Sequence, residues 1–337
     1  MSVYPKLTVD LAKLQHNMAA IVEMCRPFGI SSFGVTKVCL GWPEVGQALL
    51  EGGAIGLADS RLRNLRRLKE AGLSPLMLLR SPALSEVEEV VETAQISLNS
   101  EKAVLKALSD AAAARGVVHQ VLLMVDLGDM REGVWDDKLL DLYAYARKLP
   151  GIEVWGLGAN FACLNGSPPW RGQYQRLAEL AQACGDPSLV ISGGNSSTLH
   201  IIRQGLWPGE WTSHVSNLRI GESAFLGWDI IDQTPLPGCY QDVCRLLGEV
   251  IEVQDKPTPQ GLRRRALVAL GKQDLGTGSI RPIQEGMEVK GITSDHAVVD
   301  VTGGPHVEVG SVLAFAVDYW ALLALCTSPY VIKEAFR

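Results

Sequence analysis

The sequence predicts an α/β protein in which a (β/α)8 barrel of the TIM type is followed by a smaller, mostly β C-terminal domain. Short apolar runs alternate with amphipathic helical segments from residue 33 to about residue 227, which indicates a parallel sheet covered by helices. After residue 248 the runs shorten and no long helix separates them, a pattern typical of antiparallel sheets. An open doubly wound sheet is the alternative for the first part, but no GxGxxG motif follows an early strand.

The barrel prediction depends on the number of apolar runs, because eight strand–helix units close such a barrel. In chain order, the predicted strands are Phe33–Val38, Ala54–Ala58, Leu76–Leu79, Gln95–Leu98, Val118–Asp126, Val154–Asn160, Leu189–Ser192 and Asn217–Gly221. The helical segments between them include Arg61–Ala71, Glu101–Ala114, Asp136–Leu149 and Tyr174–Cys184. We therefore assign residues 1–230 to the barrel domain.

The C-terminal domain, residues 231–337, is predicted from short apolar runs separated by turns rich in glycine and proline. These runs are Leu246–Val253, Ala266–Leu270, Met287–Gly291, Ala297–Val301 and Val312–Val317. The segment Thr8–Asn17 begins like a strand and continues like the first barrel helix. We expect residues 1–10 to add a strand to the C-terminal domain.

Charge and cysteine usage exclude several classes of protein. The formal net charge of -6 over 337 residues gives no reason to expect nucleic acid or an anionic membrane as a partner. The seven cysteines form no CxxC pair, so neither a zinc site nor a disulfide framework is expected. The N-terminus lacks the pattern of a signal peptide, and the apolar stretch Val312–Cys326 is too short to span a bilayer. We expect a cytoplasmic protein with no metal and no membrane partner.

Polar residues gather where the predicted strands end, which is where barrel enzymes carry their active sites. These residues are Lys37, Asp126, Arg131, Asn160 and the segments 193–197 and 219–222. Lys37 is the most informative of them, because an ammonium that closes a buried strand must be paired, desolvated or used covalently. Two readings are open: the side chain reaches solvent along its own stem, or its amine holds pyridoxal phosphate (PLP) as a Schiff base.

The seventh and eighth strand ends have the composition of a phosphate site, and these loops commonly bind phosphate in barrels. Gly193 and Gly194 let the backbone approach an anion, and Asn195 and Ser196 would open a helix whose amides face it. An ordinary N-cap after a glycine turn is the alternative. Arg219 lies inside an apolar run and needs an acceptor. That acceptor is either a strand-end carbonyl or a cofactor ring nitrogen, which an arginine would keep unprotonated.

Several motifs recur in the order of a known family. They are the segments 7–11, 35–37, 125–133, 194–197, 219–221 and 318–319. Together they resemble the alanine racemase superfamily, which comprises fold type III PLP enzymes, and most closely its branch of predicted amino-acid racemases that includes ornithine racemase. The resemblance implies that Lys37 anchors PLP and acts as a catalytic base, and that Arg131 lies near the cofactor hydroxyl and the substrate carboxylate. The cofactor-binding set that it implies is Lys37, Asn160, Asn195, Ser196, Ser197, Arg219, Gly221, Glu222 and Tyr319.

The chain departs from the alanine racemase pattern in three places. No tyrosine follows Lys37, and Asn160 stands where alanine racemases have a histidine beneath the cofactor ring. In the β domain, Lys272 takes the position of the tyrosine that serves as second base from the neighbouring subunit, and Ser294-Asp295-His296 replaces Met-Asp-Gln at the substrate edge. The second base therefore stays open, and the candidates are Lys272, Asp295, His296, Cys163 and a water.

The leading hypothesis is racemisation of a free amino acid through removal and return of its α-proton, in a homodimer with shared active sites. The family branch points to ornithine, then to lysine. A distal ammonium could be held by acidic residues, namely Asp129, Glu132, Asp274 and Asp295. One alternative is an amino-acid decarboxylase of the same architecture, although those enzymes set a carboxylate against the ring nitrogen, where this chain has Arg219. Another is a PLP carrier without turnover, although such relatives end after the barrel.

Overall fold

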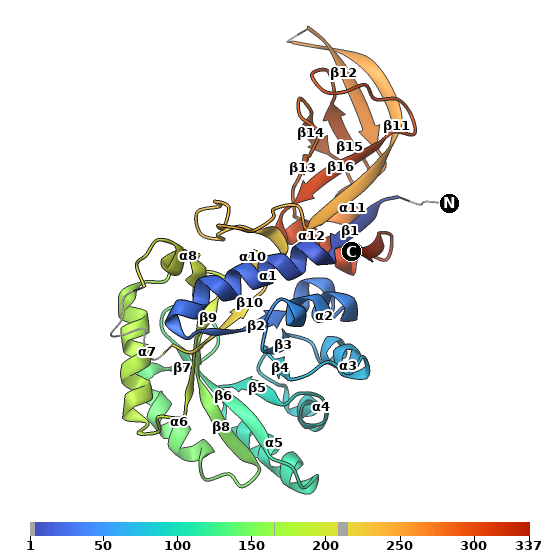
Figure 1. The fold of residues 1–337 in the computed structure, drawn as a ribbon. Coiled ribbons are helices and arrows are strands. Elements are labelled where there is room, and N and C mark those ends of the chain that lie inside the picture. The colour runs from blue at the N-terminus through green and yellow to red at the C-terminus, as the bar shows by residue number, and fades with distance from the viewer. Residues whose placement is uncertain (1–3, 165, 208–214, 260) are drawn as a thin grey trace. The chain divides into compact units, whose positions relative to one another are not determined.

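The computed structural model describes residues 4–164, 166–207, 215–259 and 261–337. Within these ranges the chain forms two compact units, coloured along the chain in Figure 1. The barrel unit comprises residues 15–37 and 41–239, and the β unit comprises residues up to 14, residues 38–40 and residues 240–337. The division into domains 1–230 and 231–337 stays a prediction.

The barrel unit is built on eight parallel strands, which form a closed sheet within the described residues. Their order is β5-β4-β3-β2-β10-β9-β8-β6, and β5 also pairs with β6. The strands are β2 (Ser31–Val35), β3 (Gly56–Asp59), β4 (Leu76–Leu78), β5 (Ile96–Asn99), β6 (His119–Asp126), β8 (Ile152–Ala159), β9 (Val190–Asn195) and β10 (Asn217–Ile220). A short strand, β7 (Val134–Trp135), pairs with the end of β6. The predicted (β/α)8 barrel is confirmed.

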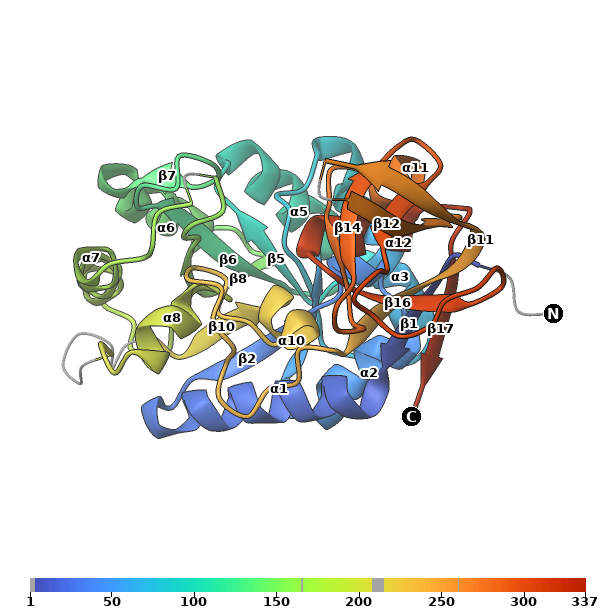
Figure 2. The same cartoon turned by 90° about the horizontal axis from the view of Figure 1, so that it is seen from above.

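Helices surround the barrel strands, as Figure 2 shows. They are α1 (Leu11–Cys25), α2 (Pro43–Glu51), α3 (Leu62–Glu70), α4 (Val87–Thr93), α5 (Lys102–Ala114), α6 (Leu139–Ala146), α7 (Arg171–Ala183), α8 (Thr198–Arg203) and α10 (Glu222–Leu226). Helix α3 illustrates why they form, because Leu62, Leu65 and Leu68 are buried at a spacing of three residues while charged residues occupy the other face. Among the described helices of the chain, none is long and apolar enough to cross a bilayer.

The inside of the barrel is a packed core. Phe33, Met77, Leu122 and Met124 are each at most 1% exposed and belong to one cluster of buried side chains. Where β8 passes β9 the backbones approach so closely that a Cβ on Gly156 would lie 1.9 Å from the Val190 carbonyl oxygen. Because side chains fill the interior, the ends of the strands are what remains for chemistry.

The β unit contains a mostly antiparallel sheet in the order β13-β16-β11-β12-β15-β14. Its strands are β11 (Cys244–Thr258), β12 (Gly261–Val268), β13 (Ile280–Pro282), β14 (Glu288–Ile292), β15 (Ala297–Asp300) and β16 (Val312–Val317). The N-terminal strand β1 (Lys6–Asp10) pairs antiparallel with β11 and parallel with the last strand, β17 (Ile332–Phe336). The predicted mostly β fold of the C-terminal part is confirmed.

The β unit also contains a helix that the sequence pattern did not predict. Helix α12 (Tyr319–Thr327) begins at Asp318, whose Oδ1 accepts a hydrogen bond from the Ala321 amide at 2.7 Å. The helix is apolar on all sides, so it shows no helical periodicity, and only the capping aspartate marks its start. The short helix α11 (Lys272–Leu275) contacts α12. Just after α11 the backbone at Gly278 comes so close to α12 that a Cβ there would lie 2.0 Å from the Ala321 nitrogen.

Candidate active site

Lys37 follows the first barrel strand, and its side chain is exposed. The prediction that this strand extends to Val38 is wrong, because β2 ends at Val35 and Lys37 opens a 3-10 turn over Lys37–Cys39. The turn begins where Thr36 leaves the strand pattern and donates its hydroxyl to Asp59 Oδ2 at 2.8 Å. Lys37 thus lies on a turn at the strand end, and the residue before it, Thr36, is fixed by its hydrogen bond to Asp59.

Asp59 is the buried anchor of this turn. Its carboxylate is 0% exposed and accepts hydrogen bonds from Asn64 Nδ2 at 2.9 Å and from the Arg61 amide at 3.0 Å. Burial raises the pKa of the Asp59 carboxyl, and its hydrogen-bond donors partly oppose that rise. Since these donors and Thr36 converge on one side chain, the backbone entering Lys37 is fixed by the barrel core.

Arg219 points its guanidinium among the ends of three neighbouring strands. It is 3% exposed, and its Nη2 donates to the Ala159 carbonyl at 2.7 Å and to Asn160 Oδ1 at 2.9 Å. Its Nη1 donates to Ser192 Oγ. Burial lowers the pKa of Arg219 to about 10, so the group stays charged at neutral pH. The strand-end carbonyl considered above is therefore one of its acceptors.

The loops after β9 and β10 lie together. Ser196 Oγ accepts from the Gly221 amide at 3.3 Å and from the Ser223 amide at 3.4 Å, which ties the two loops to one hydroxyl. Asn195 Oδ1 accepts from the Ser197 amide at 2.8 Å and shapes the turn into α8. Glu222 is the first residue of α10. The structure thus brings the predicted phosphate-loop residues to one corner of the barrel mouth.

The loop after β6 carries Arg131 and is built around a buried carboxylate. Asp126 accepts hydrogen bonds from the amides of Gly128, Met130 and Arg131 at 2.9 to 3.1 Å. The Arg131 guanidinium pairs with the Glu132 carboxylate, and its Nε lies 3.6 Å from Asp129 Oδ2.

The acidic residues considered for a distal ammonium already have partners within the chain. Asp129 Oδ1 accepts from the Cys163 amide at 2.9 Å and the Leu164 amide at 3.1 Å. Asp274 caps α11 by accepting from the Gly271 amide at 3.0 Å, and Asp295 accepts from Gln273 Nε2 at 2.8 Å. Cys163 lies beside the end of β9, where Asn195 Nδ2 is 3.0 Å from its sulfur.

The remaining predicted residues belong to the β unit, whereas Lys37 belongs to the barrel unit. Lys272 opens α11, its Nζ donates to the Gly278 carbonyl at 3.2 Å, and its amide donates to the Thr293 carbonyl at 2.8 Å. That contact joins α11 to the loop that carries Asp295 and His296. Tyr319 is half-buried at the start of α12. The structure therefore gathers Lys272, Asp295 and His296 on one corner of the β unit.

Sequence reasoning missed one residue and one contact at the barrel mouth. Asp59 ends β3 directly after an apolar run, and that placement was a usable signal. Asn160 Nδ2 donates to Glu132 Oε1 across two loops, a contact between positions 28 residues apart that no local pattern reveals.

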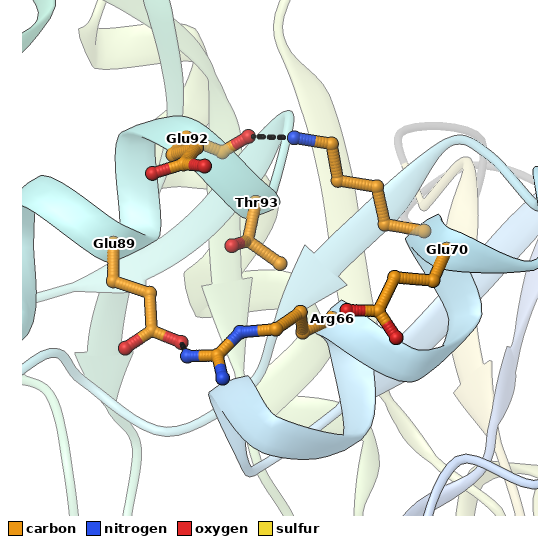
Figure 3. A pocket seen from close by; sticks show the side chains of 6 residues that line it. Arg66, Glu70, Glu89, Glu92 and Thr93 are labelled. Carbon is orange, nitrogen blue, oxygen red and sulfur yellow. Dashed lines mark hydrogen bonds and ion pairs between the residues drawn. The ribbon is translucent and has the colours of Figure 1, made fainter.

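A hollow on the outer surface, drawn in Figure 3, lies between α3 and α4. Its lining residues are Arg66, Lys69, Glu70, Glu89, Glu92 and Thr93. Arg66 pairs with Glu89, and Lys69 Nζ donates to the Glu92 carbonyl at 2.7 Å. Because these charges satisfy one another on the outer helices, away from the strand ends, the hollow is not the candidate site.

The chain has the architecture of the two-domain barrel enzymes. It combines a closed parallel barrel, which carries a lysine after its first strand and a buried arginine in its last, with an antiparallel unit. The family described as "Alanine racemase, N-terminal domain" matches residues 9–226. The chain belongs to the alanine racemase family, and the predicted family is confirmed.

Two similar proteins extend this result over 98% of the chain. A lysine racemase from Thermotoga maritima is 35% identical, with 98% of this chain and 98% of the relative covered. An ornithine racemase from Acetoanaerobium sticklandii is 35% identical, with 98% of this chain and 99% of the relative covered. The solved structure of an alanine racemase from Streptomyces coelicolor superposes with a TM-score of 0.77 at 21% identity, covering 98% of each chain. That structure supports the fold.

Proposed function

We propose that this protein is a PLP-dependent racemase of a basic free amino acid. The observation that carries the proposal is the set of strand ends at the barrel mouth, which carries an exposed lysine after the first strand, a buried arginine in the last strand and two loops tied to one hydroxyl. Racemase is the reaction class of the two relatives described above, and the substrates in their names, lysine and ornithine, are basic amino acids.

The residues present fit PLP by their chemistry. Gly194 has a φ of +107°, and a Cβ there would meet Thr198 Oγ1 at 2.7 Å, so only glycine leaves the backbone open at this corner. Asn195, Ser196, Ser197 and the Gly221 amide would hold the phosphate. Lys37 would hold the aldehyde carbon through its Nζ, Asn160 would lie beneath the ring, and Arg219 would face the ring nitrogen. When bound, PLP supplies an electron-poor ring that stabilises negative charge at the substrate α-carbon.

The chain's own groups handle the proton and the substrate. We assign to Lys37 Nζ the removal of the α-proton on one face of the substrate, and a group on the other face would return a proton. Arg131 would orient the substrate carboxylate. Because Arg219 cannot readily give up its proton, it would limit how far charge is withdrawn into the ring and so suppress side reactions. Lys272, Asp295 and His296 are the candidates for the proton donor on the other face.

We further propose a homodimer in which the β unit of one copy completes the site of the other, with Tyr319 reaching the phosphate. The support is the resemblance described above together with the position of Lys272, Asp295 and His296 in a unit separate from Lys37. If each active site needs residues of a second copy, activity per chain should fall when the protein is diluted below the dissociation constant of the dimer.

The experiment is α-proton exchange in deuterium oxide with single enantiomers of ornithine, lysine, arginine and alanine. A racemase incorporates deuterium and loses optical activity, and we expect the basic amino acids to react fastest. Lys37→Ala should abolish both signals, whereas Lys106→Ala, on the exposed face of α5 where it pairs with Asp110, is the matched control.

The outcomes separate the alternatives. Release of carbon dioxide with no racemised product would favour the decarboxylase, and the chain's Arg219 in contact with Ser192, Ala159 and Asn160 rather than with a carboxylate argues against it. Cofactor absorbance without any α-proton exchange would favour the carrier. Full activity of Lys272→Ala in both directions would remove Lys272 as the second base.

A further inference from the structure

We infer that Glu132 is a positioning residue that joins the two arginines of the barrel mouth, holding Arg131 directly and Arg219 through the Asn160 side-chain amide. The inference rests on the proposed function, because it assigns Arg131 to the substrate side of the site and Arg219 to the cofactor side. It adds a coupling between these two sides that the residue types alone do not suggest.

The first half of the link is the contact between Glu132 and Arg131. Arg131 Nη2 donates to Glu132 Oε1 at 2.8 Å, and Arg131 Nε contacts Oε2 of the same carboxylate. This is the two-pronged geometry in which a guanidinium and a carboxylate fix each other's orientation. It occupies the Nε edge of the guanidinium and leaves the Nη1 side to meet a substrate carboxylate. Asp129, which lies 3.6 Å from Arg131 Nε, adds a second negative charge on the occupied edge.

The second half of the link runs through Asn160. Its Nδ2 donates to Glu132 Oε1, while its Oδ1 accepts from Arg219 Nη2 at 2.9 Å. The amide therefore turns its negative end to the cation and its positive end to the anion. Asn160 is 8% exposed, so solvent does little to screen this path. One carboxylate oxygen is shared by the amide and by Arg131, and a shift of Glu132 must move both.

Arg219 has reason to depend on this distant carboxylate. The acceptors that it contacts are the Ser192 hydroxyl, the Ala159 carbonyl and the Asn160 amide, all of them neutral. Burial lowers the pKa of Arg219, and the Glu132 carboxylate raises it. A buried cation without an anion in contact is costly, so an anion one amide away gives Glu132 an electrostatic role beyond holding a loop.

The test is a double-mutant cycle on the holoenzyme, with the equilibrium affinity for PLP and the visible absorbance of the bound cofactor as readouts. Glu132→Ala and Asn160→Ala should each weaken PLP binding by about tenfold, which is typical for losing a hydrogen bond to a charged group. The double variant should also lose only about tenfold, because both changes cut the same link. Glu153→Ala, an exposed strand glutamate bonded to Gln120, is the matched control and should bind PLP like the wild type.

A second readout separates positioning from other roles. Asn160→Ala should raise the KM for the amino acid more than it changes kcat, although Asn160 does not contact Arg131, because Glu132 loses one of its two constraints. Glu132→Gln, which keeps the size and one acceptor oxygen, covers the case in which Glu132→Ala fails to fold. It should shift the cofactor absorbance and weaken PLP binding, since the charge is gone.

Several results would overturn the inference. One is a double variant whose loss in PLP affinity is the product of the two single losses, about a hundredfold. Another is a Glu132→Gln protein with wild-type PLP affinity and spectrum. A third is a Glu132→Gln protein whose KM rises for ornithine but not for alanine, because Glu132 would then hold the distal ammonium. A wild-type protein that binds no PLP would remove the proposed function itself, and that result is distinct from all three.

Discussion

Replacing His119 should remove a pH-dependent part of the stability of the barrel unit. His119 opens β6, is 2% exposed, and its Nε2 lies 2.7 Å from Ser97 Oγ. Asn99 Nδ2 donates to the same hydroxyl at 2.9 Å, and a neutral imidazole can either donate to this oxygen or accept its proton. Burial lowers the pKa of His119 to about 4, compared with about 6.5 in an unfolded chain.

The sign follows from proton binding. Between pH 6.5 and pH 4 the unfolded chain binds a proton at this histidine and the native chain does not, so stability is complete above pH 6.5 and is lost as the pH falls toward 4. The difference between the two pKa values corresponds to about 3 kcal/mol of unfolding free energy in total. About 1 kcal/mol of it should be lost at pH 5.5 and about 2 to 3 kcal/mol at pH 4.5.

The assay compares wild type with His119→Gln, which keeps an acceptor for Ser97, at pH 7.5, 5.5 and 4.5. Hydrogen exchange of peptides that cover β6, measured in increasing urea, reports the barrel unit by itself. The wild type should lose about 2 to 3 kcal/mol more than the variant between pH 7.5 and 4.5. His306→Gln, an exposed histidine of the β unit, should change nothing. A gap between wild type and His119→Gln that stays constant over this range would refute the reasoning.

Three further substitutions test the packing around the site. Asp59→Ala leaves the Asn64 and Arg61 donors without their acceptor and should cost about 2 to 4 kcal/mol in urea unfolding; a loss below about 1 kcal/mol would contradict the anchor role. Tyr174→Phe removes a fully buried hydroxyl that donates to Thr198 Oγ1 at 3.0 Å, and the expected cost is about 1 kcal/mol in the same assay. Gly156→Ala forces a Cβ to within 1.9 Å of the Val190 oxygen and should cost about 3 kcal/mol or more, so an unchanged melting temperature would disprove that close approach.

The barrel could be predicted from sequence because its signal is local. Each of the eight apolar runs overlaps one of the eight strands, since a buried parallel strand must be apolar along its length. Helix α12 could not be predicted in this way, because a helix that is apolar on all sides has no periodicity. The end of β2 was also misplaced, because a side-chain contact between Thr36 and Asp59 ends the strand pattern before Lys37.

The residue types of the candidate site could be predicted from the sequence, but their hydrogen-bond partners could not. Strand-end positions predicted that Lys37, Arg131 and Arg219 lie at one mouth of the barrel, because topology alone brings such ends together; their roles stay a prediction. The sequence could not show that the carboxylates of Asp129 and Asp274 accept hydrogen bonds from backbone amides. An aspartate that caps a turn and one that binds a ligand look the same in a sequence. Which polar groups bond to one another can be read only from the folded structure.

The position of β1 has a consequence for how the protein is made. This strand ends at Asp10, yet its partners begin at Cys244 and Ile332. During synthesis, Leu7 and Val9, which are at most 1% exposed in the finished sheet, are made long before either of their partner strands. The barrel strands can therefore fold before β17 is made, whereas β1 keeps one edge unpaired until then. A chain stopped before residue 332 would leave one edge of β1 open to pairing with other chains.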